Sequence, residues 1–197
     1  MRATAATTIS PVFGEAFGWV GRHRDREAQA VYVAEARAFR SSEMLTARPG
    51  LDALRADTEA IMSSLWWYAH LGLRKCFVRA NETGARGSSC TVSYGYIVDI
   101  RYADDAERYT VTHELAHAAN AIVFHRPDWH GPNFRAWHVA FVAAAFGDEW
   151  GETLAASYRQ AGLVIGPAPQ ILDHSIGRTP VAWKRRRPRN TAVSPNE

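Results

Sequence analysis

Apolar residues recur every three or four positions over residues 25–40, the spacing that gathers them on one face of an α-helix. We therefore predict a first helix there, with a repeating face that holds Ala28, Val31, Tyr32, Ala34, Glu35 and Phe39. A second helix is predicted from Asp52, a suitable N-cap, to about His70, because Gly72 can end it. Its apolar face holds Leu54, Ile61, Leu65 and Tyr68, and His70 is expected at the surface.

Two later stretches alternate apolar and polar residues, which is the pattern of half-buried β-strands. Residues 73–79 and 91–102 are predicted as strands, and the loop of residues 81–89 between them is rich in Gly and Ser. Gly95, in the middle of the second strand, indicates a bulge or a close approach of another backbone. One face of that strand holds Val92, Tyr94, Tyr96, Val98 and Ile100.

A third helix is predicted after the strands. Asp104, with Glu107 three positions later, resembles a capping box, so we expect this helix to begin there and to run to about Phe124. Its residues are apolar nearly all round, which is typical of a buried helix. Pro127 disfavours helical geometry in the residue before it and stops the helix.

Two more helices complete the predicted domain. Pro132 suits the first position of the next helix, Gly131 frees the backbone before it, and Gly147 ends it. A last helix is expected at about residues 148–161. The predicted elements form an α+β fold with one small sheet and several helices.

The charge of the chain is unevenly distributed. The 197 residues are 47% hydrophobic, enough for one ordinary core, and carry a net charge of +3. Residues 1–162 hold 17 basic and 18 acidic residues, whereas residues 163–197 hold 6 and 2, with five prolines. We predict a mobile leader at residues 1–22, one folded domain at residues 23–162 and a Pro/Arg-rich basic tail at residues 163–197. The near-neutral domain is not a typical nucleic-acid platform.

The cysteines and the hydropathy limit the class of protein. Cys76 and Cys90 are the only cysteines, too few for a disulfide framework or a four-cysteine zinc ribbon. The N-terminus lacks the apolar core of a signal peptide, since Pro11 and Gly14 interrupt it. No stretch approaches the roughly 18 apolar residues of a membrane span. We expect a soluble, cytoplasmic protein with free thiols.

The candidate chemistry lies in the third helix, at His113-Glu114-Leu115-Ala116-His117. Positions four apart lie one turn above each other on a helix, so two imidazoles can bind one Zn²⁺. Glu114 can then act as the base that takes a proton from water at the metal. A buried helix that carries two His and a Glu must satisfy them, and a metal ion does so.

A catalytic zinc needs a third protein ligand. The spacing HExxHxxGxxH would require Gly at position 120 and His at position 123, where the chain has Asn120 and Val123. A Glu ligand from the following helix is excluded, because residues 132–146 contain no acidic residue. The remaining candidates are His125, Asp128, His130 and His138.

Among these four, we favour His130, which lies between Trp129 and the stiff Gly131-Pro132 turn. His125 is expected at the exposed end of the helix. Asp128 could bind the metal or accept the second ring proton of a ligand histidine. His138 shares its helix face with apolar residues and is more typical of a core histidine with satisfied hydrogen bonds.

The HExxH motif at 113–117, together with His130-Gly131-Pro132-Asn133-Phe134, resembles the SprT/Spartan-like zinc metalloproteases. This resemblance implies a zincin-like minimal metalloprotease fold, zinc held by His113, His117 and His130, and Glu114 as the catalytic base. Members that act on DNA–protein crosslinks usually add a DNA-binding module such as a zinc ribbon, and this chain lacks cysteines for a ribbon. A second resemblance, to less characterised metallohydrolases of actinobacteria and phages, extends over residues 24–35 and 147–162.

The sequence therefore predicts a zinc-dependent metallopeptidase that holds one Zn²⁺ and acts on protein or peptide substrates. In zinc peptidases an edge strand near the metal often holds an extended substrate, and residues 91–102 are the candidate, although sheet packing alone gives the same pattern. Two alternatives remain. One is a zinc hydrolase of a non-peptide substrate. The other is a nucleic-acid-binding protein with a structural metal site, whose contacts would come from the basic run at residues 184–189.

Overall fold

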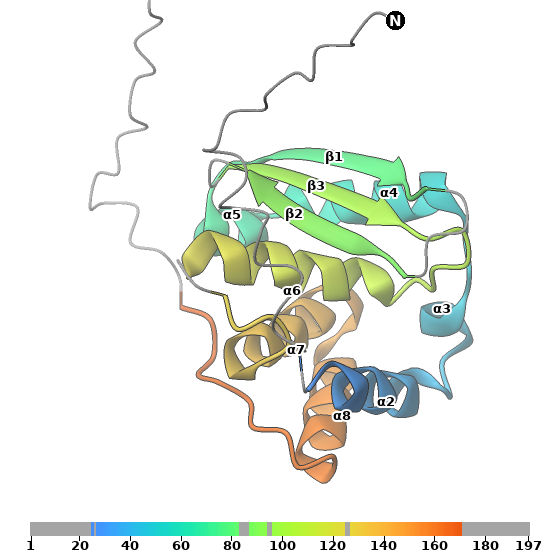
Figure 1. Cartoon of the computed structure of the whole chain (residues 1–197), viewed down its shortest axis with the longest axis vertical. Helices are drawn as coiled ribbons and strands as arrows, with labels where there is room; N and C mark the ends of the chain where they lie inside the picture. The colour runs from blue at the N-terminus through green and yellow to red at the C-terminus, as the bar shows by residue number, and fades with distance from the viewer. Residues whose placement is uncertain (1–24, 26, 83–86, 94–95, 125–126, 171–197) are drawn as a thin grey trace, which may run out of the picture.

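The computed structural model describes residues 25, 27–82, 87–93, 96–124 and 127–170. The predicted leader, most of the predicted tail, Gly95 and His125 lie outside these residues. The described chain has the predicted α+β fold, with seven helices and a small sheet (Figure 1). The elements are α2 Ala28–Phe39, α3 Glu43–Thr46, α4 Leu51–Met62, α5 Leu65–Leu71, β1 Lys75–Ala80, β2 Ser89–Ser93, β3 Ile97–Tyr102, α6 Thr110–Val123, α7 Pro132–Phe146 and α8 Asp148–Gln160.

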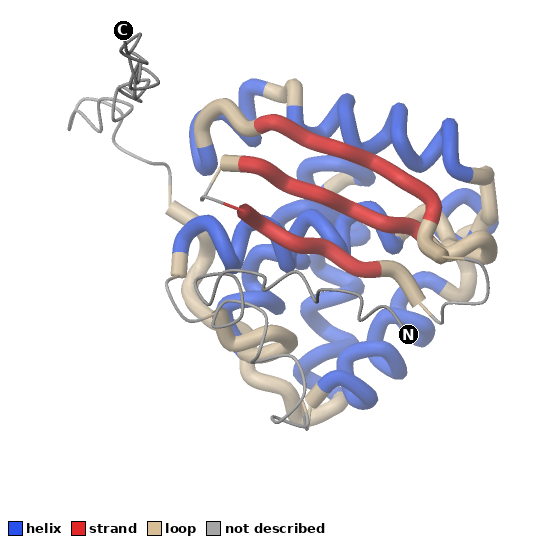
Figure 2. Tube along the Cα trace, turned by 45° about the horizontal axis from the view of Figure 1, so that its top comes forward, coloured by secondary structure: helices blue, strands red, loops and turns tan. Residues whose placement is uncertain are grey.

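The sheet has the strand order β1-β3-β2, so β3 is central. It pairs parallel to β1 and antiparallel to β2. Figure 2 shows the three strands side by side, with the helices behind them. Alternate residues of β3, namely Val98, Ile100 and Tyr102, are buried against those helices.

The prediction of one strand over residues 91–102 is wrong, because the chain turns back between β2 and β3. Val92 lies opposite Val98 in the antiparallel pair, and the amide of Tyr96 donates to the carbonyl of Ser93 at 3.3 Å. A period of two residues looks the same whether a strand continues or returns as a hairpin, so alternation did not reveal the turn. Tyr96 accordingly does not share the buried face of Val98.

The predicted second helix is in fact two. The Ser64 side chain accepts a hydrogen bond from the amide of Trp67 at 3.1 Å and caps the new helix α5, so α4 stops before it. The N-cap of α4 is Gly50 rather than Asp52. His70 is buried instead of lying at the surface, because its ring stacks on Trp66 with centroids 4.2 Å apart.

The helix α6 begins at Thr110, not at Asp104, so the predicted capping box with Glu107 is wrong. The amide of Arg108 donates instead to the carbonyl of Ala47, just after α3, at 2.8 Å, and that of Tyr109 donates to the carbonyl of Leu45, within α3, at 3.1 Å. These long-range hydrogen bonds hold residues 103–109 as turns, which a local pattern does not reveal. As predicted, α6 is buried on nearly all sides.

The helices α7 and α8 have the predicted boundaries, with Pro132 at the first turn and Gly147 between them. Figure 1 shows α6 between the sheet and a second layer that contains α7, α8 and α2. The packed chain continues past residue 162, since Leu163 is buried and the amide of Gly166 donates to the carbonyl of Pro132 at 2.8 Å. Across the described residues, every helix is too short or too polar to cross a bilayer.

Candidate metal centre

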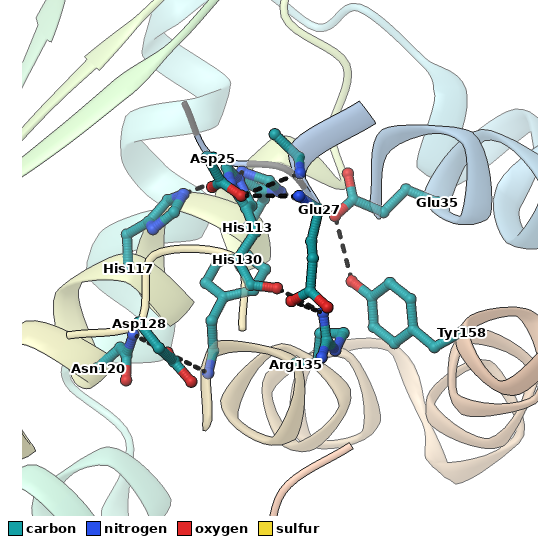
Figure 3. Close-up of polar contacts among 12 residues, drawn as sticks. Asp25, Glu27, Glu35, His113, His117, Asn120, Asp128, His130, Arg135 and Tyr158 are labelled. Carbon is teal, nitrogen blue, oxygen red and sulfur yellow. Dashed lines mark hydrogen bonds and ion pairs between the residues drawn. The ribbon is translucent and has the colours of Figure 1, made fainter. Parts of the chain in front are cut away.

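Three histidine rings meet beside α6. His113 and His117 lie one turn apart on this helix, and the turn before α7 brings His130 to them (Figure 3). The Nε2 atom of His113 lies 3.2 Å from Nε2 of His117 and 3.2 Å from Nε2 of His130. A tetrahedral zinc ion with Zn–N bonds of about 2.0–2.1 Å separates its ligand nitrogens by roughly 3.3 Å. The cluster therefore has the dimensions of a three-histidine zinc site.

The surroundings favour a neutral ring at two of the three histidines. At His113, burial lowers the pKa, but the charge and the hydrogen bond of Glu35 outweigh it and raise the pKa. Burial, followed by the nearby charges of His113 and His130, lowers the pKa of His117 well below its usual value. Burial and the charge of His113 also lower the pKa of His130. A metal ion binds the lone pair of a neutral imidazole, so this environment suits coordination.

Glu114 follows His113 on α6 and is buried. Its Oε2 atom has no hydrogen-bond partner among the described residues, which is unusual for a buried carboxylate oxygen. Burial raises the pKa of Glu114 to about 7, while the charge of His113 acts in the opposite direction. The three histidines fit a bound zinc ion, and Glu114, next to His113 on the same helix, has a buried carboxylate oxygen that no described residue occupies.

Glu35, on α2, supports His113 from the side opposite the cluster. The Nδ1 atom of His113 donates to Oε1 of Glu35 at 2.8 Å, and the hydroxyl of Tyr158 donates to the same oxygen at 3.2 Å. The side chain of Glu35 is only 1% exposed. Burial would raise the pKa of this carboxyl, but His113 and His138 outweigh it and lower the pKa. Sequence reasoning missed this role, although a carboxyl on an apolar helix face was a readable signal.

Asp25 supports His130 in the same way. One carboxylate oxygen accepts a hydrogen bond from Nδ1 of His130, and the other accepts from the amides of Glu27 and Ala28 at 3.1 Å, so that Asp25 also caps α2. The buried guanidinium of Arg135 donates to the carbonyl of His130 at 2.7 Å and to Glu27 at 2.9 Å. Sequence reasoning did not identify the contacts of Asp25 with His130 and of Glu27 with Arg135, because each joins segments more than 100 positions apart.

Asp128, the main alternative ligand, points away from the cluster. Its carboxylate accepts hydrogen bonds from the Asn120 side chain at 2.8 Å and from the amide of Asn133 at 2.9 Å (Figure 3). It therefore fixes the start of α7 on α6. Gly131 leaves room for this carboxylate, because a Cβ atom there would lie 2.6 Å from Cγ of Asp128. The expected need for backbone freedom at Gly131 is wrong, since its φ is −73°.

His138 is a core histidine with satisfied ring nitrogens, as its apolar neighbours predict. Its Nδ1 lies 2.8 Å from the hydroxyl of Tyr158, and its Nε2 lies 3.2 Å from the hydroxyl of Thr112. Glu35, His113 and His138 also come close enough together to hold an ion. His113 faces this group through Nδ1, the atom that donates to Glu35, so the three histidines that meet through Nε2 are the stronger candidate for a metal site.

Aromatic rings surround the histidine cluster. Phe134 is fully buried and packs against His117 with centroids 4.4 Å apart. Tyr32 is 48% exposed and stacks on His113 at 5.4 Å, while Trp129 is 40% exposed and lies 6.2 Å from the ring of His117. One buried ring thus supports the cluster and two half-exposed rings border it.

The outer strand β2 is the sheet element that packs on α6. Its second edge pairs with no other strand in the described part of the chain. The edge strand near the histidines is therefore Ser89–Ser93, and the remainder of the predicted stretch of residues 91–102 contributes the central strand.

Comparison with known proteins agrees with the motif. Neither the curated proteins nor the solved structures give a match to this chain. The resemblance to actinobacterial and phage metallohydrolases stays a prediction. The profile of the SprT-like family, however, matches residues 37–151, which include His113, Glu114, His117 and His130. With more than half of its residues matched, the chain belongs to the SprT-like family.

Proposed function

We propose that this protein is a zinc-dependent metallopeptidase with one zinc ion held by His113, His117 and His130. The observation that supports this most directly is the meeting of three Nε2 atoms within 4.8 Å of one another. Membership of the SprT-like family agrees with a metalloprotease-like role. Bound zinc supplies two things to hydrolysis, namely a water with a pKa of about 7 and a polarised carbonyl.

Glu114 is the proposed general base. Its buried Oε2 is free of hydrogen bonds to the described residues, so it is available to accept a proton from the attacking water. A carboxylate in this position can take up a proton and return it to the leaving amine. A purely structural metal site has no use for such a group, which favours catalysis over the nucleic-acid alternative.

The surroundings of the site favour a peptide over a small non-peptide substrate. The free edge of β2 can pair with an extended peptide backbone by strand addition. Tyr32 and Trp129 offer half-exposed rings against which substrate side chains can pack. The basic run at residues 184–189, on which the nucleic-acid alternative depends, lies outside the described residues.

Elemental analysis and a peptide digest test this proposal together. The purified protein should hold about one zinc per chain. It should cleave members of a proteome-derived peptide library, lose this activity with a chelator and regain it when zinc is added back. Zinc binding without cleavage of any peptide would favour the non-peptide hydrolase. Absence of zinc under zinc-replete conditions would contradict the metal site itself.

A further inference from the structure

We infer that Asp25 and Glu35 are positioning residues of the metal centre, each turning the Nε2 atom of one histidine toward the ion. This inference rests on the proposed zinc site and deepens it. Both residues lie outside the region matched by the family profile, residues 37–151. Both belong to one segment, the helix α2 and its cap, so a single element outside the matched region would orient two of the three proposed ligands (Figure 3).

The hydrogen bonds determine which nitrogen of each ring can bind metal. An ionised carboxylate only accepts hydrogen bonds, so the Nδ1 atoms of His113 and His130 must carry the protons that they donate. In the neutral rings this leaves the lone pair on Nε2, the atom that faces the cluster. His117 has no such carboxylate partner among the described residues, so the orienting role is specific to His113 and His130.

Glu35 is itself held in one orientation. The hydroxyl of Tyr158 donates to its Oε1 at 3.2 Å. Because the carboxylate is buried and cannot follow a moving ring, its position limits rotation of the His113 imidazole. The Glu35 carboxylate therefore does more than accept the Nδ1 proton of His113, because it also restricts the orientation of this ring.

Asp25 divides its two oxygens between two tasks. One caps α2 and the other accepts from His130, so the start of the helix and the third histidine are fixed together. Arg135 strengthens this connection by binding both Glu27 and the carbonyl of His130. An Asn at position 25 has one oxygen and one amino group and therefore cannot perform both tasks.

The test uses the full-length variants Glu35→Gln and Asp25→Asn, with Ser157→Ala as the matched control. Ser157→Ala removes a buried hydrogen bond to the same helix α2 but touches no histidine. Zinc affinity is measured by competition with a chromogenic chelator, and folding by thermal melting with the chelator in excess. The visible absorption of the cobalt(II)-substituted protein reports the geometry of the ligands independently of activity.

We expect Glu35→Gln and Asp25→Asn to bind zinc about 10–100-fold more weakly than the wild type, with altered cobalt spectra. Ser157→Ala should melt earlier but keep both the affinity and the spectrum. If Glu35→Gln folds poorly, Asp25→Asn alone decides, because its side chain lies at the edge of the core. Wild-type zinc affinity in these variants would overturn the inference and leave the proposed function intact. A wild-type protein that binds no zinc would overturn both.

Discussion

At the scale of single residues, the unpaired Oε2 of Glu114 is a cost that the fold tolerates. A buried polar atom without a partner typically costs about 1–3 kcal/mol. Replacement by Gln in Glu114→Gln removes the buried charge and the base but preserves the shape of the side chain. We expect zinc content and melting temperature to stay at or above wild-type values, while turnover of peptides falls at least about 100-fold. Undiminished turnover would show that another group is the base.

Trp129 is a second residue that locally destabilises the folded state, in this case through its backbone conformation. It is the only non-glycine residue with positive φ in the described part of the chain, at 49°. This left-handed conformation costs an L-residue about 1–2 kcal/mol, and glycine does not incur it. Since its ring is half exposed beside His117, we predict that this conformation serves contact with a substrate.

The pair Trp129→Gly and Trp129→Ala separates these two effects. Both variants lose the ring, so both should show a KM for peptides raised by a similar factor. Only Gly relieves the strain, so its free energy of unfolding should exceed that of the Ala variant by about 1 kcal/mol. Denaturant titrations and steady-state kinetics measure the two quantities. An unchanged KM in both variants would remove Trp129 from the substrate site.

At the scale of elements, the turn between α6 and α7 controls where His130 lies. Gly131→Ala would place a Cβ atom 2.6 Å from Cγ of Asp128, so the Asp128 side chain must move. The carboxylate would then lose its hydrogen bonds to the Asn120 side chain and to the amide of Asn133 at the start of α7. We expect weaker zinc binding as well as a lower melting temperature.

Gly162→Ala is the control for this prediction. Gly162 has a φ of +74° with open space around it, so the substitution introduces backbone strain without touching the site. It should lower the melting temperature and leave zinc affinity unchanged. Equal zinc affinity in the two variants would mean that the turn does not position His130.

The elements also show what the sequence could predict. Helices α2, α6, α7 and α8 followed from helical periodicity, Pro132 and Gly147, because these signals are local. The hairpin of β2 and β3 was missed, because apolar and polar residues alternate in the same way whether a strand continues or turns back. The meeting of His130 with His113 was anticipated from spacing and family resemblance. The carboxylates of Glu35 and Asp25 behind these rings were not anticipated, because contacts between distant segments leave no periodic pattern in the sequence.

At the scale of the whole molecule, the proposed metal site is assembled from segments on both sides of the family match. Asp25 and Glu35 come from the N-terminal side, and Tyr158 and the carbonyl of Val164, which accepts from Arg135 at 2.6 Å, come from the C-terminal side. The folded unit that supports the histidines is therefore larger than residues 37–151.

Deletion of the residues from Lys184 onward tests whether the basic tail contributes to the proposed metal site. The contacts to the histidines described above come from residues between 25 and 158, so we expect zinc content and peptide turnover to equal those of the full chain. Any salt-sensitive affinity for nucleic acid should fall, because the deletion removes the run of basic residues. Affinity that survives the deletion would place a nucleic-acid surface on the folded domain.

Zinc should also stabilise the whole fold, because the three proposed ligands join α6 to the turn before α7, and Asp25 and Glu35 join both to α2. At a free zinc concentration about 100 times Kd, binding contributes about 2.7 kcal/mol to the free energy of unfolding. For a protein of this size that raises Tm by roughly 5–10 °C.

Glu114→Gln should keep this shift, since it removes no ligand, whereas His130→Ala should lose most of it. Mg²⁺ at the same concentration serves as the control, because it prefers oxygen ligands. The measurement is thermal melting of four proteins, namely the wild type and the variants Glu114→Gln, His130→Ala and Asp128→Ala, each with zinc and with Mg²⁺. If His130→Ala shifts as much as the wild type while Asp128→Ala does not, the third ligand is Asp128, and the cluster must rearrange to bind its metal.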